Sequence, residues 1–206
     1  MSLTRNLTLE EQFGGIDIYL FDQLQRGRIA AGMRVLDAGC GGGRNLIYLL
    51  REGAEVMAVD GSPEAIDAVR ELAQRLGREL PEQNLQVARI EQLPFADAVA
   101  DVVICCAVLH FASDEQHLRA MVRELGRVLR PGGLLFARLG SRIGMEFEPV
   151  GNGRYRVGHG AEWFLVDEPL LLDLTRELGG TLLDPLKTTI VQGQRCMTTW
   201  VARKHA

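Results

Sequence analysis

The sequence predicts an α/β fold with a seven-stranded, mostly parallel sheet, helices on both faces and an antiparallel C-terminal hairpin. Short apolar runs alternate with segments of helical periodicity over most of the 206 residues. Such alternation indicates parallel strands joined by crossover helices. The last two apolar runs are separated by four residues only, 192–195. So short a link permits only an antiparallel pair.

The predicted parallel strands are dense in Val, Ile and Leu, as buried strands are. They cover residues 33–38, 55–60, 85–90, 99–107 and 134–139. The predicted hairpin strands cover residues 181–191 and 196–203.

Three helices are predicted between and after these strands. The first covers residues 62–77, where a Ser-Pro pair begins the helix and a glycine ends it. The second follows a capping box formed by Ser113 and Gln116 and is stopped by the Pro-Gly-Gly at 131–133. The third covers residues 167–178. Residues 140–163 are Gly-rich, and we expect an irregular insertion there that acts as a lid or as a plain surface loop.

Composition restricts the classes of function. Apolar residues make up 47% of the chain and charged residues 24%, and the formal net charge is −4. We therefore expect no nucleic-acid partner and no anionic membrane surface. No apolar run approaches the roughly 20 residues of a membrane span. The four cysteines have no metal-ligand spacing, so no metal is expected, and a reducing, cytoplasmic location fits them best.

A glycine-rich loop at residues 39–43 follows the first predicted parallel strand. Glycines there let backbone N–H groups approach a ligand at the start of a helix. Asp60 ends the next strand, where a carboxylate can accept both hydroxyls of a ribose. The ligand is therefore expected to be a nucleoside or nucleotide.

The residues around the loop distinguish between nucleotides. A dinucleotide fingerprint needs a third glycine where this chain has Arg44, and a P-loop needs a Gly-Lys pair that is absent here. Asp37, just before the loop, suits a ligand with an ammonium group and repels a pyrophosphate. S-adenosylmethionine has an ammonium and a sulfonium charge and no phosphate.

With these motifs the chain resembles the class I S-adenosylmethionine-dependent methyltransferases, of the methyltransferase type 11/12-like kind, which have a Rossmann-like fold. The resemblance covers residues 33–140, and the terminal hairpin matches the family's reversed last strands. The loop ending Gly-Arg-Asn is also similar to the tellurite-resistance and thiopurine branch, which acts on small molecules. One departure concerns adenine: Arg89 stands where many members have Asp, so the contact with the amino group falls to Glu91 or to backbone near Ile90.

The resemblance implies a set of cofactor-binding residues, in which Asp37 and the loop hold the methionine moiety and Asp60 holds the ribose. The set is Asp37, Gly39, Cys40, Gly41, Arg44, Asn45, Asp60, Gly61, Ile90, Glu91 and Cys106. The chain has no internal repeat or linker, so we expect one domain in four parts: an N-terminal helical cap (1–32), the cofactor-binding core (33–139), the insertion (140–166), and the last helix with the hairpin (167–206).

Substrate-side candidates are fewer. His110 directly follows the fourth predicted strand, at the edge where such sheets bind ligands, and it either steers a substrate, takes a proton, or hydrogen-bonds its neighbours. His159 and Trp163 lie in the insertion and are candidate substrate contacts or surface residues. Tyr19 lies in an amphipathic segment that either covers the cofactor or packs into the core.

The sequence therefore predicts transfer of a methyl group to a small-molecule acceptor by in-line displacement, with S-adenosylhomocysteine as the second product. Alignment can carry such chemistry without an obvious base. Two alternatives stay open: an NAD(P)- or FAD-dependent oxidoreductase on a similar fold, and a non-catalytic S-adenosylmethionine-binding module.

Overall fold

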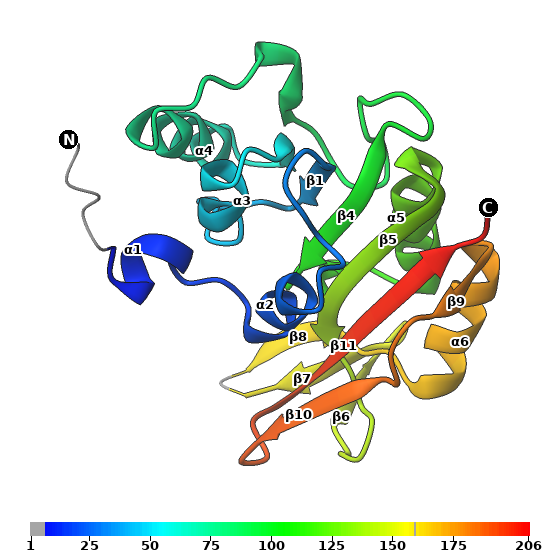
Figure 1. The fold of residues 1–206 in the computed structure, drawn as a ribbon. Helices are drawn as coiled ribbons and strands as arrows, with labels where there is room; N and C mark the ends of the chain where they lie inside the picture. The colour runs from blue at the N-terminus through cyan, green and yellow to red at the C-terminus, as the bar shows by residue number, and fades with distance from the viewer. Residues whose placement is uncertain (1–6, 159) are drawn as a thin grey trace.

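A mostly parallel sheet forms the centre of the protein in the computed structural model, which describes residues 7–158 and 160–206 (Figure 1). The strand order is β10-β11-β5-β4-β1-β2-β3, and β9 also pairs with β11. The parallel strands are β1 (Arg34–Ala38), β2 (Glu55–Asp60), β3 (Leu85–Val87), β4 (Ala100–Cys106) and β5 (Leu129–Gly140). The antiparallel strands are β9 (Gly180–Leu182), β10 (Lys187–Val191) and β11 (Arg195–Lys204).

This sheet confirms the predicted fold class, with differences at the strand ends. The predicted strand 181–191 is divided into β9 and β10, so an eighth strand joins the seven expected. β3 ends at Val87 rather than 90, and β5 begins at Leu129, five residues before the predicted start. The Pro-Gly-Gly at 131–133 lies within β5, where the pairing with β4 shifts register.

The expectation of an irregular insertion at 140–163 is wrong. This region contains a separate three-stranded antiparallel sheet, made of β6 (Glu148–Gly151), β7 (Arg154–Val157) and β8 (Ala161–Phe164). The glycines that suggested irregular backbone form the turns: Gly151 and Gly153 both have positive φ, a conformation that glycine adopts readily. Charged and apolar residues alternate along β7, as a two-sided strand requires.

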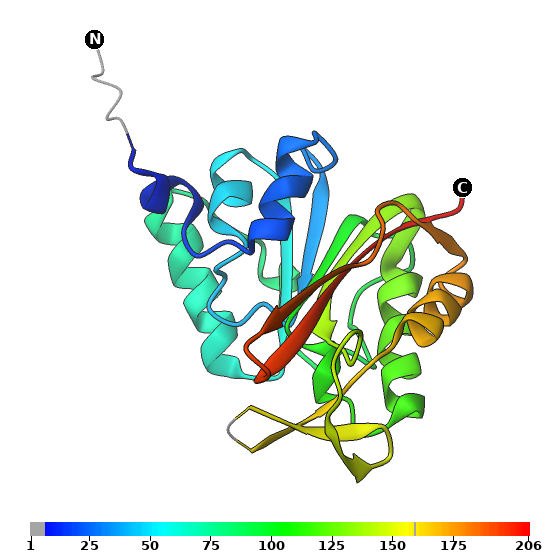
Figure 2. The ribbon, with the colours of Figure 1, turned by 90° about the horizontal axis from the view of Figure 1, so that it is seen from below.

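Helices cover both faces of the central sheet, as predicted (Figure 2). On one face lie α2 (Ile18–Gln25), α3 (Ile47–Arg51) and α4 (Pro63–Arg75). On the other lie α5 (Glu115–Val128) and α6 (Glu168–Glu177). The short elements are α1 (Leu9–Phe13) and the 3-10 helices η1 (Glu82–Asn84) and η2 (Leu109–Phe111).

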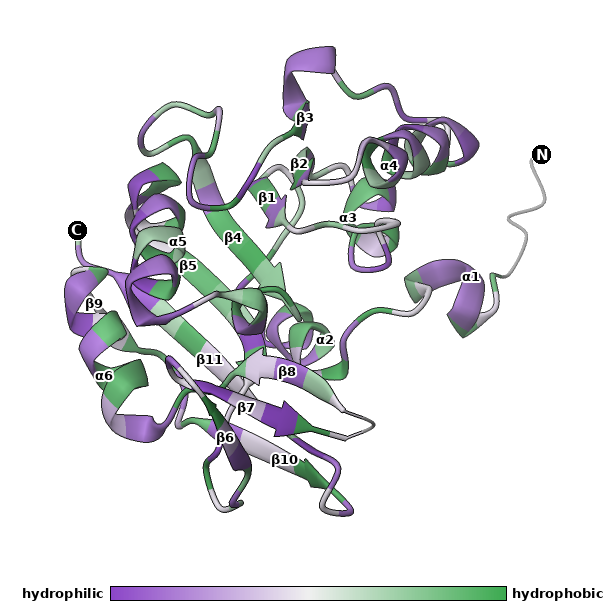
Figure 3. Cartoon of the chain, turned by 180° about the vertical axis from the view of Figure 1, so that it is seen from behind, coloured by the Kyte–Doolittle hydropathy of each residue, from purple (hydrophilic) through white to green (hydrophobic). Residues whose placement is uncertain are grey.

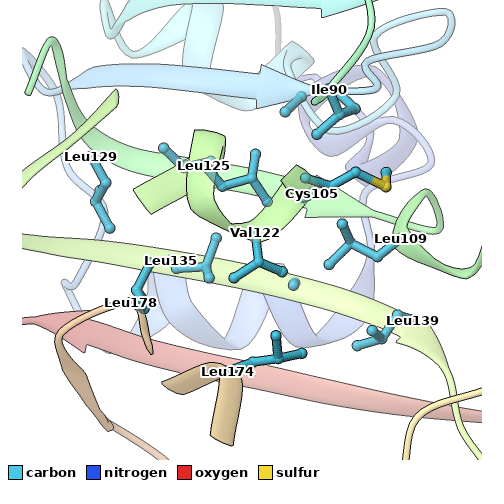
Figure 4. Packing of buried hydrophobic residues seen from close by; sticks show 14 of the residues in the cluster. Ile90, Cys105, Leu109, Val122, Leu125, Leu129, Leu135, Leu139, Leu174 and Leu178 are labelled. Carbon is cyan, nitrogen blue, oxygen red and sulfur yellow. The ribbon is translucent and has the colours of Figure 1, made fainter. Parts of the chain in front are cut away.

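Two apolar cores follow from the alternation along the strands. Leu36 and Leu135 belong to the core on the side of α5 and α6, whereas Val35 and Phe136 belong to the core on the side of α2, α3 and α4. Figure 4 shows Val122 and Leu125 of α5 packed over β4 and β5. Figure 3 shows β4 and β5 as strongly hydrophobic and much of β7 as hydrophilic. No helix in residues 7–158 and 160–206 combines the length and apolar character that crossing a bilayer requires.

Helix caps agree with the sequence at two of the predicted starts. Ser62 caps α4, and Asp167 caps α6 by accepting the Leu170 N–H. The predicted capping box of Ser113 and Gln116 is wrong: Asp114 caps α5 instead, accepting the His117 N–H at 2.8 Å. Aspartate and serine are about equally good N-caps, so the pattern alone could not choose between neighbouring residues.

Candidate cofactor site

The glycine loop turns sharply where β1 ends. Gly39 has φ +82°, and a Cβ there would lie 2.3 Å from Cγ2 of Val108. The N–H groups of Gly39 and Cys40 donate to the Val59 carbonyl of β2, at 2.8 and 3.1 Å. Only glycine permits both this backbone conformation and this close approach. The loop is therefore held against the ends of β2 and β4.

The Asp60 carboxylate fixes the loop from the neighbouring strand. Its Oδ2 accepts the Gly41 N–H at 2.9 Å, and its Oδ1 accepts the Ser62 N–H at 3.0 Å. A carboxylate offers about four acceptor positions, so it can still accept hydroxyl donors. Asp60 thus has a defined orientation and free acceptor capacity.

A cavity of about 540 Å³ opens beside this loop. Its size is typical of a small-molecule site. All the predicted cofactor-binding residues except Asp37 line it: Gly39, Cys40, Gly41, Arg44, Asn45, Asp60, Gly61, Ile90, Glu91 and Cys106. The remaining wall is formed by Gly42, Ala88, Arg89, Ala107, Val108, Phe111, His117 and Met121.

Asp37 lies behind the loop and is 1% exposed. Neither carboxylate oxygen has a hydrogen-bond partner in the described residues. Burial raises the pKa of Asp37 to about 7, Arg44 counteracts this increase, and the negative charge of Asp60 adds to it. A buried carboxylate without a partner costs stability, which indicates a position prepared for a nearby positive charge.

Several cavity residues come from the segment after β4 and were not predicted. Phe111 belongs to η2, and His117 and Met121 to α5. The Nε2 atom of His117 lies 3.3 Å from Oε2 of Glu91, without the alignment of a hydrogen bond. The available signal was the position of this segment, since residues following the carboxyl end of a central strand line the ligand crevice of such sheets.

A polar cluster joins the wall of the cavity to the N-terminal segment. The Arg44 guanidinium donates to Cys106 Sγ at 3.1 Å, and Arg138 donates to Oδ2 of Asp17 at 3.2 Å. The Cys106 thiol lies 3.5 Å from the same oxygen, and the Asp17 N–H donates to Asn45 at 3.0 Å. Burial, assisted by Asp17, raises the pKa of Cys106 to about 12, so the thiol stays protonated. Asp17 and Arg138 had no sequence signal, because 121 residues separate them.

The substrate-side candidates do not lie on the wall of this cavity. His110 is buried beside it: Nδ1 accepts the Gly140 N–H at 3.4 Å, and the ring packs on Trp163 with centroids 4.2 Å apart. Burial lowers the pKa of His110 to about 4, so the ring is neutral. The Tyr19 hydroxyl instead lies 2.7 Å from the Thr189 hydroxyl. His159 lies outside the described residues.

Comparisons with known proteins agree with this geometry. Residues 36–137 match the model of the methyltransferase domain family. The chain is 38% identical over 106 residues to a ubiquinone biosynthesis O-methyltransferase of Methylocella silvestris, covering 52% of this chain and 39% of that protein. It is 32% identical over 131 residues to an uncharacterized methyltransferase of Synechocystis sp., covering 64% of this chain and 55% of that protein. The chain thus spans about half the length of these curated relatives.

A solved structure extends the comparison over most of the fold. The 1,6-didemethyltoxoflavin-N1-methyltransferase of Burkholderia thailandensis, bound to 1,6-didemethyltoxoflavin and S-adenosylhomocysteine, is 25% identical with a TM-score of 0.64. The match covers 89% of this chain and 75% of that one. Residues 36–137 of this chain thus match the methyltransferase domain family, and the fold is that of the S-adenosylmethionine-dependent methyltransferases.

Proposed function

We propose that this protein transfers the methyl group of S-adenosylmethionine to a small-molecule acceptor and releases S-adenosylhomocysteine. Two carboxylates carry the proposal: Asp60 on the wall of the cavity and Asp37 behind the glycine loop. Asp60 has acceptor capacity for ribose hydroxyls, and Asp37 is buried without a partner behind the glycine loop. The residues present therefore fit a cofactor that has a ribose, a positive charge and no phosphate.

Each part of the cofactor has a candidate contact. Asp60 would accept the ribose hydroxyls, and the loop from Gly39 to Gly41 would approach the methionine moiety. Arg44, which donates to the Gly15 carbonyl and to the Cys106 thiol, would face the methionine carboxylate. Glu91 would accept from the adenine amino group in place of the aspartate that Arg89 replaces.

The chain contributes alignment more than acid–base chemistry. The bound cofactor would supply an electrophilic methyl group on a sulfonium. Holding an acceptor in line with it converts a bimolecular step into an effectively unimolecular one. The neutral Cys106 thiol is no competing nucleophile. Because Nδ1 of His110 already accepts a hydrogen bond, the neutral ring carries its proton on Nε2. We propose that His110 helps to position the methyl acceptor by donating a hydrogen bond from Nε2.

A binding experiment tests the proposal. Thermal shift is measured with S-adenosylmethionine, S-adenosylhomocysteine and NAD on the wild type, Asp60→Asn and the control Asp67→Asn, which changes an exposed residue of α4. Ligand at 100 times its Kd stabilises by about 2.7 kcal/mol. We expect both adenosyl ligands to stabilise the wild type and the control, and Asp60→Asn to bind at least tenfold more weakly. Stabilisation by NAD alone, or by none of the three, would overturn the proposal.

A further inference from the structure

The small sheet of β6, β7 and β8 carries ion pairs on one face, beside the buried Phe164, and apolar cross-strand pairs on the other. On one face Arg154 and Arg156 form ion pairs with Glu162 and Glu148, at 3.7 and 3.2 Å. On the other face the cross-strand partners are apolar: Tyr155 with Trp163, and Val157 with Ala161. An apolar face on a surface sheet normally packs on a core. Val157 is buried in this way, but Ala161 is exposed and Trp163 is only half-buried.

That apolar face lines a second cavity, of about 450 Å³. Its opposite wall is the turn between β10 and β11, which Figures 1 and 2 both place close to the small sheet. The cavity is large enough for one or two aromatic rings. Its side chains are Val157, Ala161, Trp163, Val191, Gln194 and Arg195.

The second cavity adjoins the candidate cofactor site through one stacked pair. Trp163 packs on His110, and the neighbours of His110 in the chain, Val108 and Phe111, line the first cavity. Gly140 makes this stacking possible, since a Cβ there would lie 3.0 Å from the indole and 3.2 Å from Cβ of His110. The stacked pair therefore forms a border that the second cavity shares with the neighbourhood of the candidate cofactor site.

Charge decides what kind of molecule fits. Arg195 lines the cavity, is exposed, and forms no ion pair within residues 7–158 and 160–206. No acidic side chain of that part of the chain lines the cavity. An aromatic wall with an unpaired guanidinium at its rim complements a flat apolar body that bears an anionic group, because arginine binds carboxylates bidentately.

We propose that this second cavity binds the distal part of the methyl acceptor, and that the acceptor is an aromatic carboxylic acid. The inference rests on the proposed methyltransferase function, because only a cofactor in the first cavity makes the second an acceptor site. Trp163 offers its ring face to the aromatic body, and Arg195 binds the carboxylate. Both are specificity-determining residues in this assignment.

Calorimetric titration with two probes tests the assignment: 2-naphthoate, and 2-naphthamide, which has the same shape without the charge. The variants are Arg195→Gln, Trp163→Ala, and the control Arg75→Gln, an exposed arginine of α4. We expect 2-naphthoate to bind the wild type and Arg75→Gln equally, and Arg195→Gln at least tenfold more weakly. The amide should bind the wild type about as weakly as naphthoate binds Arg195→Gln. Trp163→Ala should weaken both probes.

Thermal shift with S-adenosylhomocysteine is measured on the same samples, which verifies folding and separates the two proposals. Stabilisation of all variants together with absent naphthoate binding, or with equal binding of naphthoate and amide, would overturn the acceptor assignment alone. Unchanged naphthoate affinity in Arg195→Gln would do the same. If S-adenosylhomocysteine stabilises nothing, the proposed function fails and the acceptor role fails with it, whatever naphthoate does.

Discussion

Asp37 makes the stability of the ligand-free protein depend on pH in an unusual direction. The carboxyl is buried, and its pKa is raised from 3.8 to about 7. Between these two values the folded protein holds a proton that the unfolded chain has released. Stability therefore falls as the pH rises from about 4 to about 7, and this contribution is constant above that range. Replacement by Asn removes the titration and hence this slope.

The magnitude follows from the size of the pKa change. A difference of about 3 pKa units at about 1.4 kcal/mol each gives a loss of about 4 kcal/mol between pH 4 and pH 8. The Asn amide would also be buried without partners, at a cost of about 1–3 kcal/mol. That cost does not change with pH, so it displaces the stability curve of Asp37→Asn without tilting it.

Urea unfolding of the wild type and Asp37→Asn at half-unit steps from pH 4 to pH 8 measures the effect. As the pH rises, we expect the free energy of unfolding of the variant to increase relative to that of the wild type, by up to about 4 kcal/mol. Titrating groups that do not interact with Asp37 cancel in this difference. Saturating S-adenosylhomocysteine, which carries an ammonium group, should reduce the gain. A difference that stays constant across the range, or shrinks with rising pH, would refute the argument from an unpaired buried carboxylate.

Three further predictions concern the loop, an ion cluster and a helix end. Gly39→Ala and Gly53→Ala both place a side chain at φ +82°, and this backbone conformation costs about 1–2 kcal/mol of stability in each variant. In a thermal-shift assay only Gly39→Ala should abolish binding of S-adenosylhomocysteine. Hydrogen bonds from Arg34, acting against burial, hold the pKa of Asp101 well below its usual value of 3.8. The stability that the ionised Asp101 contributes to the folded protein is therefore complete above about pH 4 and is lost as the pH falls further. Asp101→Asn should cost about 1–3 kcal/mol in urea unfolding at pH 7, and a deficit equally large at pH 2 would contradict this. Lys204 donates to two carbonyls at the end of α5, at 2.7 and 2.9 Å. Lys204→Met should therefore lower the free energy of unfolding by about 1 kcal/mol. The control Arg75→Met, which changes an exposed residue, should leave it unchanged.

The sequence predicted the features that local chemistry fixes. The glycine loop and Asp60 were identified because tight turns and strand-end carboxylates have short, specific patterns. The structure brings both to one cavity. Asp37 was also singled out, but its burial behind the loop became visible only in the fold.

What the sequence could not show depends on contacts between distant segments. The pair of Asp17 and Arg138 joins the N-terminal region to the end of β5, and neither neighbourhood has a motif. Likewise, the partnership of Trp163 with His110 needs β8 to fold back over the end of β4. The small sheet was missed for another reason: glycines at its turns outweighed the alternation within its short strands.

The cluster around Asp17 sets a limit on how far the chain can be shortened. Removal of α1 (Leu9–Phe13) would take away the ring contacts of Phe13 with Tyr48 and Phe21. Removal past Asp17 would leave Arg138 without its carboxylate and Asn45 without its backbone donor, both beside the cofactor cavity. The part of the chain that the candidate cofactor site needs therefore begins ahead of Asp17, well before residue 36, where the match to the methyltransferase domain family begins.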